Sequence, residues 1–530
     1  MNSGSTAAKK IVILGGGTAG WMAANLMAAR WQDRDFDIAL IEAPDIGIIG
    51  VGEGSTPQLK GFMDSIGVDE SEWMPACKAT YKAGITFRGW STKPGFPSYF
   101  HPFPAQPDDY TAPAFFYNSY VRRQGIDVEG HPDHFFLATY LAQHKLAPIA
   151  PEHFPFEINY GYHFDSGLLG QFLSKVAAGR GVDHVRAKVT DVKLDERGDI
   201  EALLTDEGQR IEADVFVDSS GFRALLIQQA LRVPFVSFGE NLFNDAAVVM
   251  PTPPDEDVEC QTISTALQNG WAWRIPLTHR IGNGYVYSSG FCSADEAETE
   301  LREHLGLLDA DVEARHLKMR VGRVERHWEK NCLAIGLSQG FIEPLEATAL
   351  HLVQETVVGF IEAYEEGGFT DRYRQRFNDS VNERFENVRN YIVCHYRVNS
   401  RTDTEYWVEN GRNNHLSSSL RGVLETWVGS KNLSDELDRQ KIDNYYPSMS
   451  WHCLLAGYGL YPTDEQLKPG NETATKFKLP VIHDFIRRCG MNFQPHKELL
   501  AELGSASDGS SSDTPAYSAA DADRLYRAVR

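Results

Sequence analysis

Three glycines near the N-terminus have the spacing of a turn that holds a pyrophosphate. They are Gly15, Gly17 and Gly20, which fit the pattern G-x-G-x-x-G. An apolar run at 11–14 precedes them and a helix-favouring stretch at 18–31 follows. The first glycine permits a tight bend, the second lets the backbone approach the phosphates, and the third lets the helix pack on the sheet. The backbone at Thr18 and Ala19, at the start of the helix, adds a favourable charge for an anion.

A carboxylate follows at the place where such a fold contacts a ribose. Residues 36–41 are predicted to form a second strand, and Glu42 lies at its end. A carboxylate there accepts hydrogen bonds from the ribose hydroxyls of an adenine dinucleotide. Strand, helix, second strand and acid together predict a β-α-β unit that binds a dinucleotide. The glycine motif alone does not separate FAD from NAD.

Two later strand-to-turn segments favour FAD. Residues 214–223 read as a strand that runs into Asp218 and a glycine turn. Residues 333–345 read as a strand followed by a turn that contains Gly336 and Gly340. FAD oxidoreductases use such later segments to wrap an extended cofactor, and NAD dehydrogenases do not need them. No second complete glycine motif is present for a bound nicotinamide, so the electrons are expected from a separate protein.

The remaining pattern predicts a large α/β protein. Helices are expected at 59–87, 168–178 and 348–366. Strands are expected at 185–204 and 210–217, as a meander, and at 247–251 and 270–277, with a hairpin at 282–290. We expect a Rossmann-like FAD-binding module of the aromatic-monooxygenase type with a β-sheet substrate region, followed by a mainly helical C-terminal module. The predicted units are an FAD-binding and catalytic module at 8–370, a helical module that closes the substrate pocket at 371–500, a flexible linker at 504–516 and a short helix at 517–530.

The composition excludes several classes of protein. The 530 residues carry a net charge of -22, and so acidic a chain lacks the basic face that nucleic acid requires. No apolar run of transmembrane length is present, so no membrane span is expected. The seven cysteines include no C-x-x-C pair. We therefore expect neither a disulfide framework nor a metal site, and a reducing cytoplasm is the expected location.

Three further motifs carry more specific information than the glycine turn. The sequence GWAWRIP contains Trp271, Trp273 and Ile275, FIEPLEATAL contains Glu346, and TYKAGITF contains Lys82. Taken alone, the lysine would be a surface residue and the alternating tryptophans would be a packed core strand. In combination with GGGTAGW, these motifs resemble the flavin-dependent tryptophan and indole halogenases, from the first strand to about residue 460.

The resemblance implies a reaction in three stages. Reduced FAD (FADH2), O2 and chloride or bromide give hypohalous acid, which halogenates an indole-type aromatic by electrophilic substitution. The reduced flavin would come from a separate NAD(P)H-dependent flavin reductase.

The resemblance also implies a role for each motif. Lys82 would hold the oxidant, and Glu346 would polarise it or take the ring proton. Trp271, Trp273 and Ile275 would wall off the flavin from the substrate. Backbone N–H groups at Thr348 and Ala349, at a helix start, would hold the halide. Ala347 and Ala349 stand where tryptophan-specific members often show Ser and Gly, so the preference for chloride or bromide stays open.

The substrate pocket matches the family less closely. The expected walls are His101 and Phe103 on one side, and Tyr445, Tyr446 and Trp451 on the other. Tryptophan-specific members carry an acid for the substrate ammonium between the tyrosine pair and the tryptophan, and this chain has Pro-Ser-Met-Ser there. We therefore expect free tryptophan to be a poor substrate, and indole or a larger indole-bearing molecule to fit better.

Two other functions compete with this interpretation. An FAD-dependent aromatic monooxygenase (hydroxylase) shares the fold and transfers oxygen directly, so it needs neither Lys82 nor the tryptophan wall. A flavin- or nucleotide-binding sensor would need neither of them nor Glu346. The sequence leaves open the native substrate, the ring position, the identity of the reductase and the oligomeric state, with a homodimer allowed.

Overall fold

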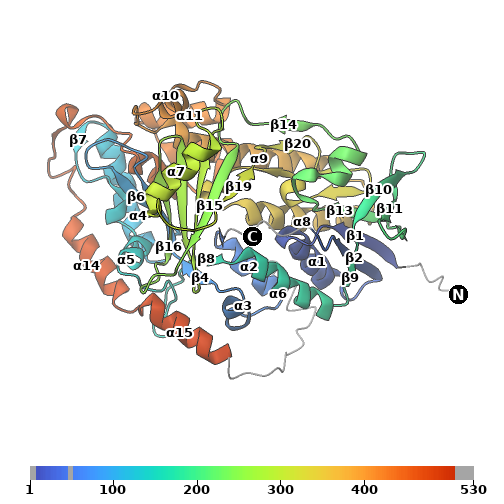
Figure 1. Ribbon diagram of the computed structural model, residues 1–530. Helices are drawn as coiled ribbons and strands as arrows, with labels where there is room; N and C mark the ends of the chain where they lie inside the picture. The colour runs from blue at the N-terminus through green and yellow to red at the C-terminus, as the bar shows by residue number, and fades with distance from the viewer. Residues whose placement is uncertain (1–7, 46–51, 508–530) are drawn as a thin grey trace.

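The computed structural model describes residues 8–45 and 52–507, which fold around two large β-sheets (Figure 1). The first sheet has the order β21-β22-β13-β1-β2-β9, and every pair except β21–β22 is parallel. Its strands are β1 (Lys9–Leu14), β2 (Phe36–Glu42), β9 (Asp183–Arg186), β13 (Val215–Asp218), β21 (Trp328–Glu329) and β22 (Cys332–Ala334). The predicted Rossmann-like α/β architecture is confirmed.

The first sheet is buried on both faces because apolar residues follow one another along β1. Ile11 and Ile13 belong to the core shared with the helices, whereas Val12 and Leu14 belong to a second core on the opposite face. The helices on the first face are α1 (Thr18–Trp31), α6 (Ser166–Gly179) and α8 (Ala349–Glu366). The layer on the second face contains β10 (Val189–Leu194), β11 (Ile200–Thr205), β12 (Arg210–Ile211) and a π-helical turn (Leu225–Ala230).

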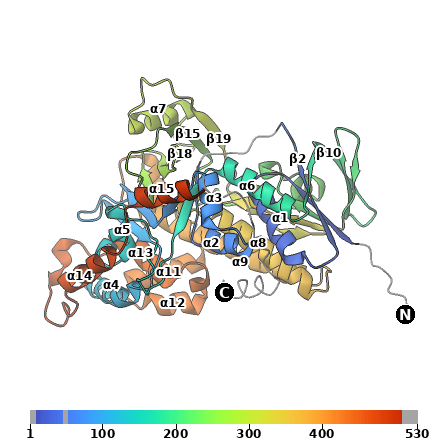
Figure 2. The same ribbon diagram turned by 90° about the horizontal axis from the view of Figure 1, so that it is seen from below.

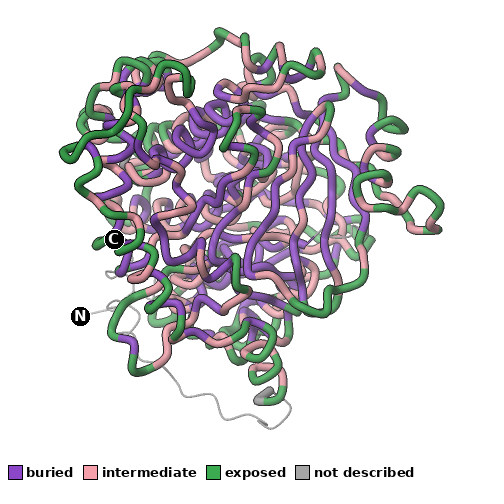
Figure 3. Tube along the Cα trace, turned by 90° about the vertical axis from the view of Figure 1, so that its left-hand side faces the viewer, coloured by how far each residue is buried: buried purple, intermediate pink, exposed green. Residues whose placement is uncertain are grey.

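The second sheet has the order β19-β15-β18-β17-β16-β5-β6 and is antiparallel except between β16 and β5. Its strands are β5 (Gly84–Arg88), β6 (Ser98–Pro102), β15 (Ala246–Thr252), β16 (Gln261–Ala266), β17 (Gly270–Pro276), β18 (Ile281–Tyr287) and β19 (Arg315–Lys318). Long buried strands run through the middle of the molecule, and exposed segments lie mostly at its rim (Figure 3).

Two predictions for local structure were wrong. Of the helix expected at 59–87, only α2 (Gln58–Ser65) and α3 (Glu70–Ala76) form, and the chain then enters β4 (Thr80–Lys82) and β5. The β-branched and aromatic residues of this segment form strands because they pair with β6, β8 and β16. Tertiary pairing therefore overrides the local helical pattern. The hairpin expected at 282–290 is a single strand, β18, whose turn lies before it and leads back to β17.

A helical region follows residue 371, and its part from 418 to 490 lies at the left of the view from below (Figure 2). Its helices are α9 (Arg374–Arg397), α10 (Glu405–Arg412), α11 (Ser418–Val428), α12 (Leu433–Gln440), α13 (Ser448–Gly457), α14 (Leu479–Gly490) and α15 (His496–Ser507). Residues 504–507 of the linker predicted at 504–516 belong to α15. The rest of that segment and the helix predicted at 517–530 lie outside the described residues. Among the described helices none is long and apolar enough to cross a membrane.

The shorter elements connect these layers. They are β3 (Glu53–Gly54), β7 (Ile126–Asp127), β8 (Gly161–Phe164), β14 (Phe235–Ser237), β20 (Gly322–Val324), β23 (Gly340–Phe341), β24 (Lys468–Pro469), α4 (Asp108–Arg123), α5 (Leu137–Gln143) and α7 (Ala294–Leu305).

The last helix returns to the first half of the chain. α15 packs beside α3, and its first residue, His496, is fully buried (Figure 2). Burial lowers the pKa of His496 to about 4, so its ring is neutral at neutral pH. The Nε2 atom accepts a hydrogen bond from the backbone N–H of Tyr81 (3.1 Å), and Nδ1 donates to the carbonyl of Val258 (3.1 Å). These bonds hold β4 at Tyr81, one residue before the strand ends at Lys82.

We expect His496→Ala to lower the free energy of unfolding by about 1–3 kcal/mol, because it leaves the buried N–H of Tyr81 without an acceptor. Urea denaturation measures the effect. The exposed His144, changed to Ala, is the control and should change the value by less than about 0.5 kcal/mol. Equal losses for the two variants would contradict the anchoring role of His496.

Candidate active site

Lys82 reaches the interior because it ends a buried strand. It pairs with Gly161 of β8, and its side chain has no exposed surface. The Nζ atom donates a hydrogen bond to the carbonyl of Ser55 (3.1 Å) and lies 5.4 Å from the ring centre of Phe103. A buried amine is costly to charge, so both contacts help to retain its proton.

The register of the strands brings His101 and Phe103 to the same place. The chain runs from Lys82 directly into β5, where Ile85 lies opposite His101 on β6. The backbone N–H of Phe103 donates to the carbonyl of Ala83 (2.9 Å). Two of the predicted substrate residues are therefore neighbours of the predicted catalytic lysine.

Glu346 comes from a segment that lies far along the chain from Lys82. It ends a short 3-10 turn (Pro344–Glu346), and Ala347 then takes a left-handed conformation (φ 55°) that turns the chain into α8. The carboxylate is 6% exposed, and its Oε1 atom lies 2.8 Å from Nε2 of His395 on α9. The histidine has no exposed surface.

The charges of this group act on one another. Burial lowers the pKa of Lys82 to about 7, and the Glu346 carboxylate opposes that shift. Burial alone would raise the pKa of Glu346, but His101, His395 and Lys82 together hold it below its ordinary value. Burial likewise lowers the pKa of His101. Lys82, Glu346 and His101 thus share one dehydrated environment, in which electrostatic interactions are stronger than in water.

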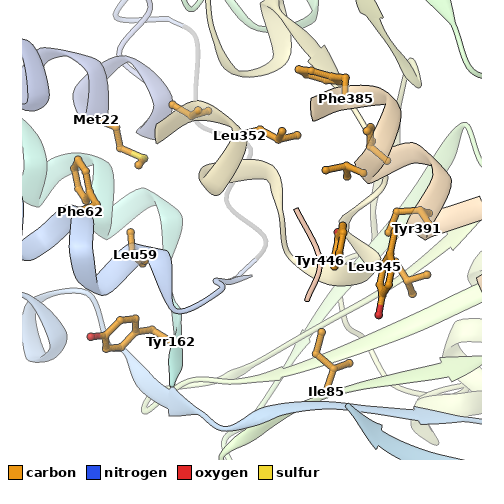
Figure 4. Close-up of a cluster of buried hydrophobic side chains, with 14 of the residues drawn as sticks. Met22, Leu59, Phe62, Ile85, Tyr162, Leu345, Leu352, Phe385, Tyr391 and Tyr446 are labelled. Carbon is orange, nitrogen blue, oxygen red and sulfur yellow. The ribbon is translucent and has the colours of Figure 1, made fainter. Parts of the chain in front are cut away.

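Aromatic rings from α9 and the following helices line the same region. The ring of Tyr391 stacks on Tyr446 with centres 3.7 Å apart, and Trp451 meets Tyr391 edge-on at 4.8 Å. His101 also contacts Tyr391 edge-on (6.3 Å). Figure 4 shows Tyr391, Tyr446 and Leu345 side by side in the core. Tyr445 faces away, toward Arg384, whose guanidinium lies 5.6 Å from its ring centre.

Several polar atoms in this aromatic region are buried without a hydrogen-bond partner. They are the hydroxyls of Tyr99 and Tyr446, Nε1 of Trp451 and Nδ1 of His101. Buried polar groups are normally paired, so unpaired ones mark a place where a ligand or water completes the bonding. The region is suited to a largely aromatic molecule with a small number of polar groups.

The tryptophan motif lies on β17, in the middle of the second sheet. Trp271, Trp273 and Ile275 are all buried, and the two indole rings lie 6.2 Å apart. Gly284 on β18 has no room for a side chain, because the ring of Trp273 covers it. The N–H of Trp271 donates to Glu343 (3.0 Å).

Glu343 fixes this wall, a role that the sequence did not reveal. Its Oε2 atom also accepts hydrogen bonds from Asn244 (2.9 Å) and the hydroxyl of Tyr396 (2.6 Å). Burial raises the pKa of Glu343, and the bonds from Trp271, Tyr396 and Asn244 oppose that shift. The residue lies in the sequence FIEPLEATAL, which carries no sign that its first acid supports a tryptophan.

The glycine turns predicted for the cofactor converge at one edge of the first sheet. Strands β1, β13 and β22 are neighbours and parallel, so their carboxyl ends meet there. Gly15 has a φ of 121°, and a Cβ atom there would lie 2.1 Å from the carbonyl of Ser219. A Cβ at Gly20 would lie 2.0 Å from the carbonyl of Gly15. A Cβ at Gly17, by contrast, would meet nothing within 4 Å, so this start of α1 faces open space.

The third turn completes the edge. Gly336 has a φ of 57°, and a Cβ there would lie 2.8 Å from Cβ of Ala19, so this turn rests on the start of α1. Gly340 packs against Gly322 on β20, where a Cβ would be 2.6 Å from the carbonyl oxygen. The close approach of two turns around an open helix end fits an extended dinucleotide.

The two predicted acids have different surroundings. Asp218 is fully buried, and its two oxygens accept five hydrogen bonds from the protein: from the backbone and hydroxyl of Ser220, from the hydroxyl of Ser338, and from the N–H groups of Leu226 and Ile227. It therefore links the second turn to the third, and its predicted contact with the cofactor stays a prediction. Glu42 is partly exposed beside Gly16, and its Oε2 lies 2.8 Å from Nε2 of His184, a partner that the sequence did not indicate.

The predicted halide residues stand at the start of α8. Thr348 is the N-cap residue, its side chain makes no capping hydrogen bond, and Ala349 begins the helix with an exposed side chain. The first N–H groups of a helix and its dipole favour an anion. Glu346 lies only two residues earlier, so this helix start is close along the chain to the carboxylate that acts on Lys82.

The chain is similar to known halogenases along most of its length. The family profile described as Tryptophan halogenase matches residues 10–472. The 7-chloro-L-tryptophan 6-halogenase KtzR of Kutzneria sp. (strain 744) is 35% identical over 521 residues, which cover 93% of this chain and 99% of that protein. The tryptophan 6-halogenase SttH of Streptomyces toxytricini is 37% identical over 482 residues, which cover 85% of this chain and 89% of that protein.

Solved structures of halogenases are also similar to this chain. The crystal structure of SttH superposes with a TM-score of 0.80 at 32% identity, covering 94% of this chain and 100% of that chain. BrvH, a flavin-dependent halogenase from Brevundimonas sp. BAL3, superposes with a TM-score of 0.79 at 30% identity, covering 94% and 99%.

We expect the stability of Lys82→Met relative to the wild type to depend on pH, because the substitution removes a buried titratable amine. The pKa of Lys82 is about 7 in the folded state and 10.5 without burial, so the unfolded chain binds more protons between these values. Stability of the wild type therefore rises with pH across this window, and the relative stability of Lys82→Met is greatest below pH 7. The stability of Lys82→Met relative to the wild type should fall by about 3 kcal/mol between about pH 6 and about pH 9.

Urea denaturation at the two pH values measures this difference in stability. The control is Lys60→Met, whose partly exposed lysine pairs with Asp64 on the surface and should contribute less than about 1 kcal/mol at either pH. A difference in stability between Lys82→Met and the wild type that does not depend on pH would contradict the lowered pKa.

Proposed function

The chain belongs to the tryptophan halogenase family, and from this premise we propose how its own residues carry out flavin-dependent halogenation of an indole-type ring. Membership of the family decides against the hydroxylase and against the sensor. The observation that carries the proposal is the shared burial of Lys82 and Glu346. We call the region around Lys82, Glu346, His101 and Tyr391 the chamber.

FAD fits the edge where the three glycine turns meet. Gly17 leaves open space at the start of α1 for the pyrophosphate, and Glu42 lies at the end of β2 for the ribose. Gly336 and Gly340 shape the third turn, and Thr348 and Ala349 offer N–H groups to a halide at the start of α8. When bound, reduced FAD supplies the activation of oxygen that converts halide into hypohalous acid.

Lys82 and Glu346 then divide the proton transfers of the substitution. The carbon of the ring attacks the halogen of hypohalous acid, and the oxygen leaves with a proton from the Lys82 ammonium as water. Glu346, kept ionised by its neighbours, takes the proton from the same ring carbon. Lys82 gives one proton and Glu346 takes one. Transfer of a proton from Glu346 back to Lys82 therefore restores both groups. A pKa near 7 suits Lys82 to this role, because it can give and regain a proton at neutral pH.

The tryptophan wall keeps the aromatic substrate away from the flavin. Trp271, Trp273 and Ile275 form one buried face of β17, and the bond from Trp271 to Glu343 holds that face in place. A small oxidant then passes from one compartment to the other, whereas an indole does not.

The substrate that we propose is indole or an indole-bearing molecule rather than free tryptophan. Between Tyr446 and Trp451 no acid is present to pair with an ammonium group. The unpaired hydroxyl of Tyr446 and the N–H of Trp451 are suited to a neutral polar group instead.

The electrons would come from a separate NAD(P)H-dependent flavin reductase. All seven cysteines are free thiols, which is in keeping with work in a reducing cytoplasm.

We expect the protein, incubated with FAD, a flavin reductase, NADH, bromide and indole, to form bromoindole detectable by mass spectrometry. Lys82→Ala should lower product formation by about 100-fold or more while FAD binding persists, because the proton donor is lost. Product that forms equally well without bromide would exclude halogenation. Unchanged turnover in Lys82→Ala would remove Lys82 from the chemistry.

We expect kcat/KM for indole to exceed that for free tryptophan by about tenfold or more, because the tryptophan ammonium would enter an aromatic pocket without a counter-ion. Met449→Glu, which places an acid between Tyr446 and Trp451, should bring the kcat/KM values for indole and free tryptophan closer together. Met449→Gln is its uncharged control. Equal kcat/KM values in the wild type would contradict this assignment.

A further inference from the structure

We propose that His395 and Tyr458 form a positioning relay behind Glu346, so that the carboxylate stays ionised and aimed at the ring proton. This inference rests on the proposed function. It gives a role to His395 and Tyr458, which the proposed roles of Lys82 and of the tryptophan wall do not include.

The geometry is a chain of three buried side chains. Nε2 of His395 lies 2.8 Å from Oε1 of Glu346, and Nδ1 of the same ring lies 2.9 Å from the hydroxyl of Tyr458. All three side chains lie in the core, and His395 has no exposed surface. Histidine and tyrosine come from different elements, α9 and the residue that follows α13, so their alignment depends on the fold of the helical region.

The hydrogen bonds assign the protons. A carboxylate only accepts, so Nε2 of His395 must carry the N–H that points to Glu346. In a neutral imidazole the other nitrogen is then an acceptor, and it receives the O–H of Tyr458. Burial raises the pKa of Tyr458 well above its ordinary value, which keeps its hydroxyl protonated for this bond.

The ring of His395 is also held in its plane. Phe87 lies 4.7 Å from it and Tyr391 meets it edge-on at 5.5 Å. Among the described residues none donates a hydrogen bond to Oε2 of Glu346. His395 therefore takes one oxygen of the carboxylate and leaves the other for the chamber, which fixes the direction from which a proton can arrive.

A pH profile separates this role from simple packing. The other titratable groups that act on Glu346 are Lys82, His101, Tyr99, Tyr391, Tyr446 and Tyr458. The phenols have raised pKa values and stay neutral, and Lys82 and His101 are still present in a His395 variant. Loss of the N–H donor removes a bond to the charged form of Glu346, so the acid limb of the kcat profile must move to higher pH.

The test compares His395→Leu, which removes the donor, with His395→Gln, which retains an N–H on a shorter, uncharged group. His395→Leu is expected to lower kcat by about 10- to 100-fold with little change in KM, and to raise the acid limb by about one pH unit. His395→Gln is expected to restore most of the rate and to return the limb toward its wild-type position. Tyr458→Phe is expected to move the limb in the same direction as His395→Leu, by less, and provides the test if His395→Leu does not fold.

The control is His327→Leu. His327 is equally buried and its Nε2 lies 3.0 Å from Asn382, but it lies outside the chamber. This variant should leave the acid limb unchanged. A second readout, the hypohalous acid trapped by a β-diketone without aromatic substrate, should stay within about twofold of wild type in the His395 variants, because His395 acts after the oxidant has formed.

An unshifted acid limb in both His395→Leu and Tyr458→Phe would overturn the relay, and so would a loss of trapped hypohalous acid equal to the loss of product. Failure of the proposed function would look different: the wild type itself would form no halogenated product.

Discussion

A buried amine and a buried carboxylate that act on each other away from water are the constraint around which this protein is organised. Each group would be costly to charge in an apolar interior, and each makes the other less so. Lys82 comes from a short strand near the N-terminus and Glu346 from a turn about half the chain away, and only the complete fold brings them into one environment. Lys82 also donates a hydrogen bond to the carbonyl of Ser55, and His395 is bonded to one oxygen of Glu346.

The two sheets position different groups of residues. The parallel sheet gathers three glycine turns at one edge and supplies the helix starts that suit phosphates and halide. The larger sheet carries the tryptophan wall on β17 and places His101 beside the lysine strand. The helices after residue 371 add Tyr391, His395 and Tyr446, so the chamber has contributions from the first, middle and last parts of the chain.

Much of this arrangement could be predicted from the sequence, where residue types and spacing carry a signal. The glycine turn, the long helix α8 and the placing of Lys82 and Glu346 in one interior follow from motifs. His395, Tyr458, Glu343 and His496 could not be found in this way, because a single buried histidine or acid has no spacing that distinguishes it from any other. The segment 59–87 was assigned too much helix, since its strands depend on partners that lie far along the chain. The five hydrogen bonds of Asp218 within the protein could not be foreseen either, because one partner, Ser338, lies 120 residues away.

The bond between His496 and the strand of Lys82 has a consequence for biosynthesis. Because the anchoring histidine lies 415 residues after Tyr81, translation has to pass residue 496 before β4 acquires this support. Until then, a nascent polypeptide on the ribosome holds β4 without the bond to His496. The order of synthesis therefore places this support after the parallel sheet, whose strands all lie before residue 335.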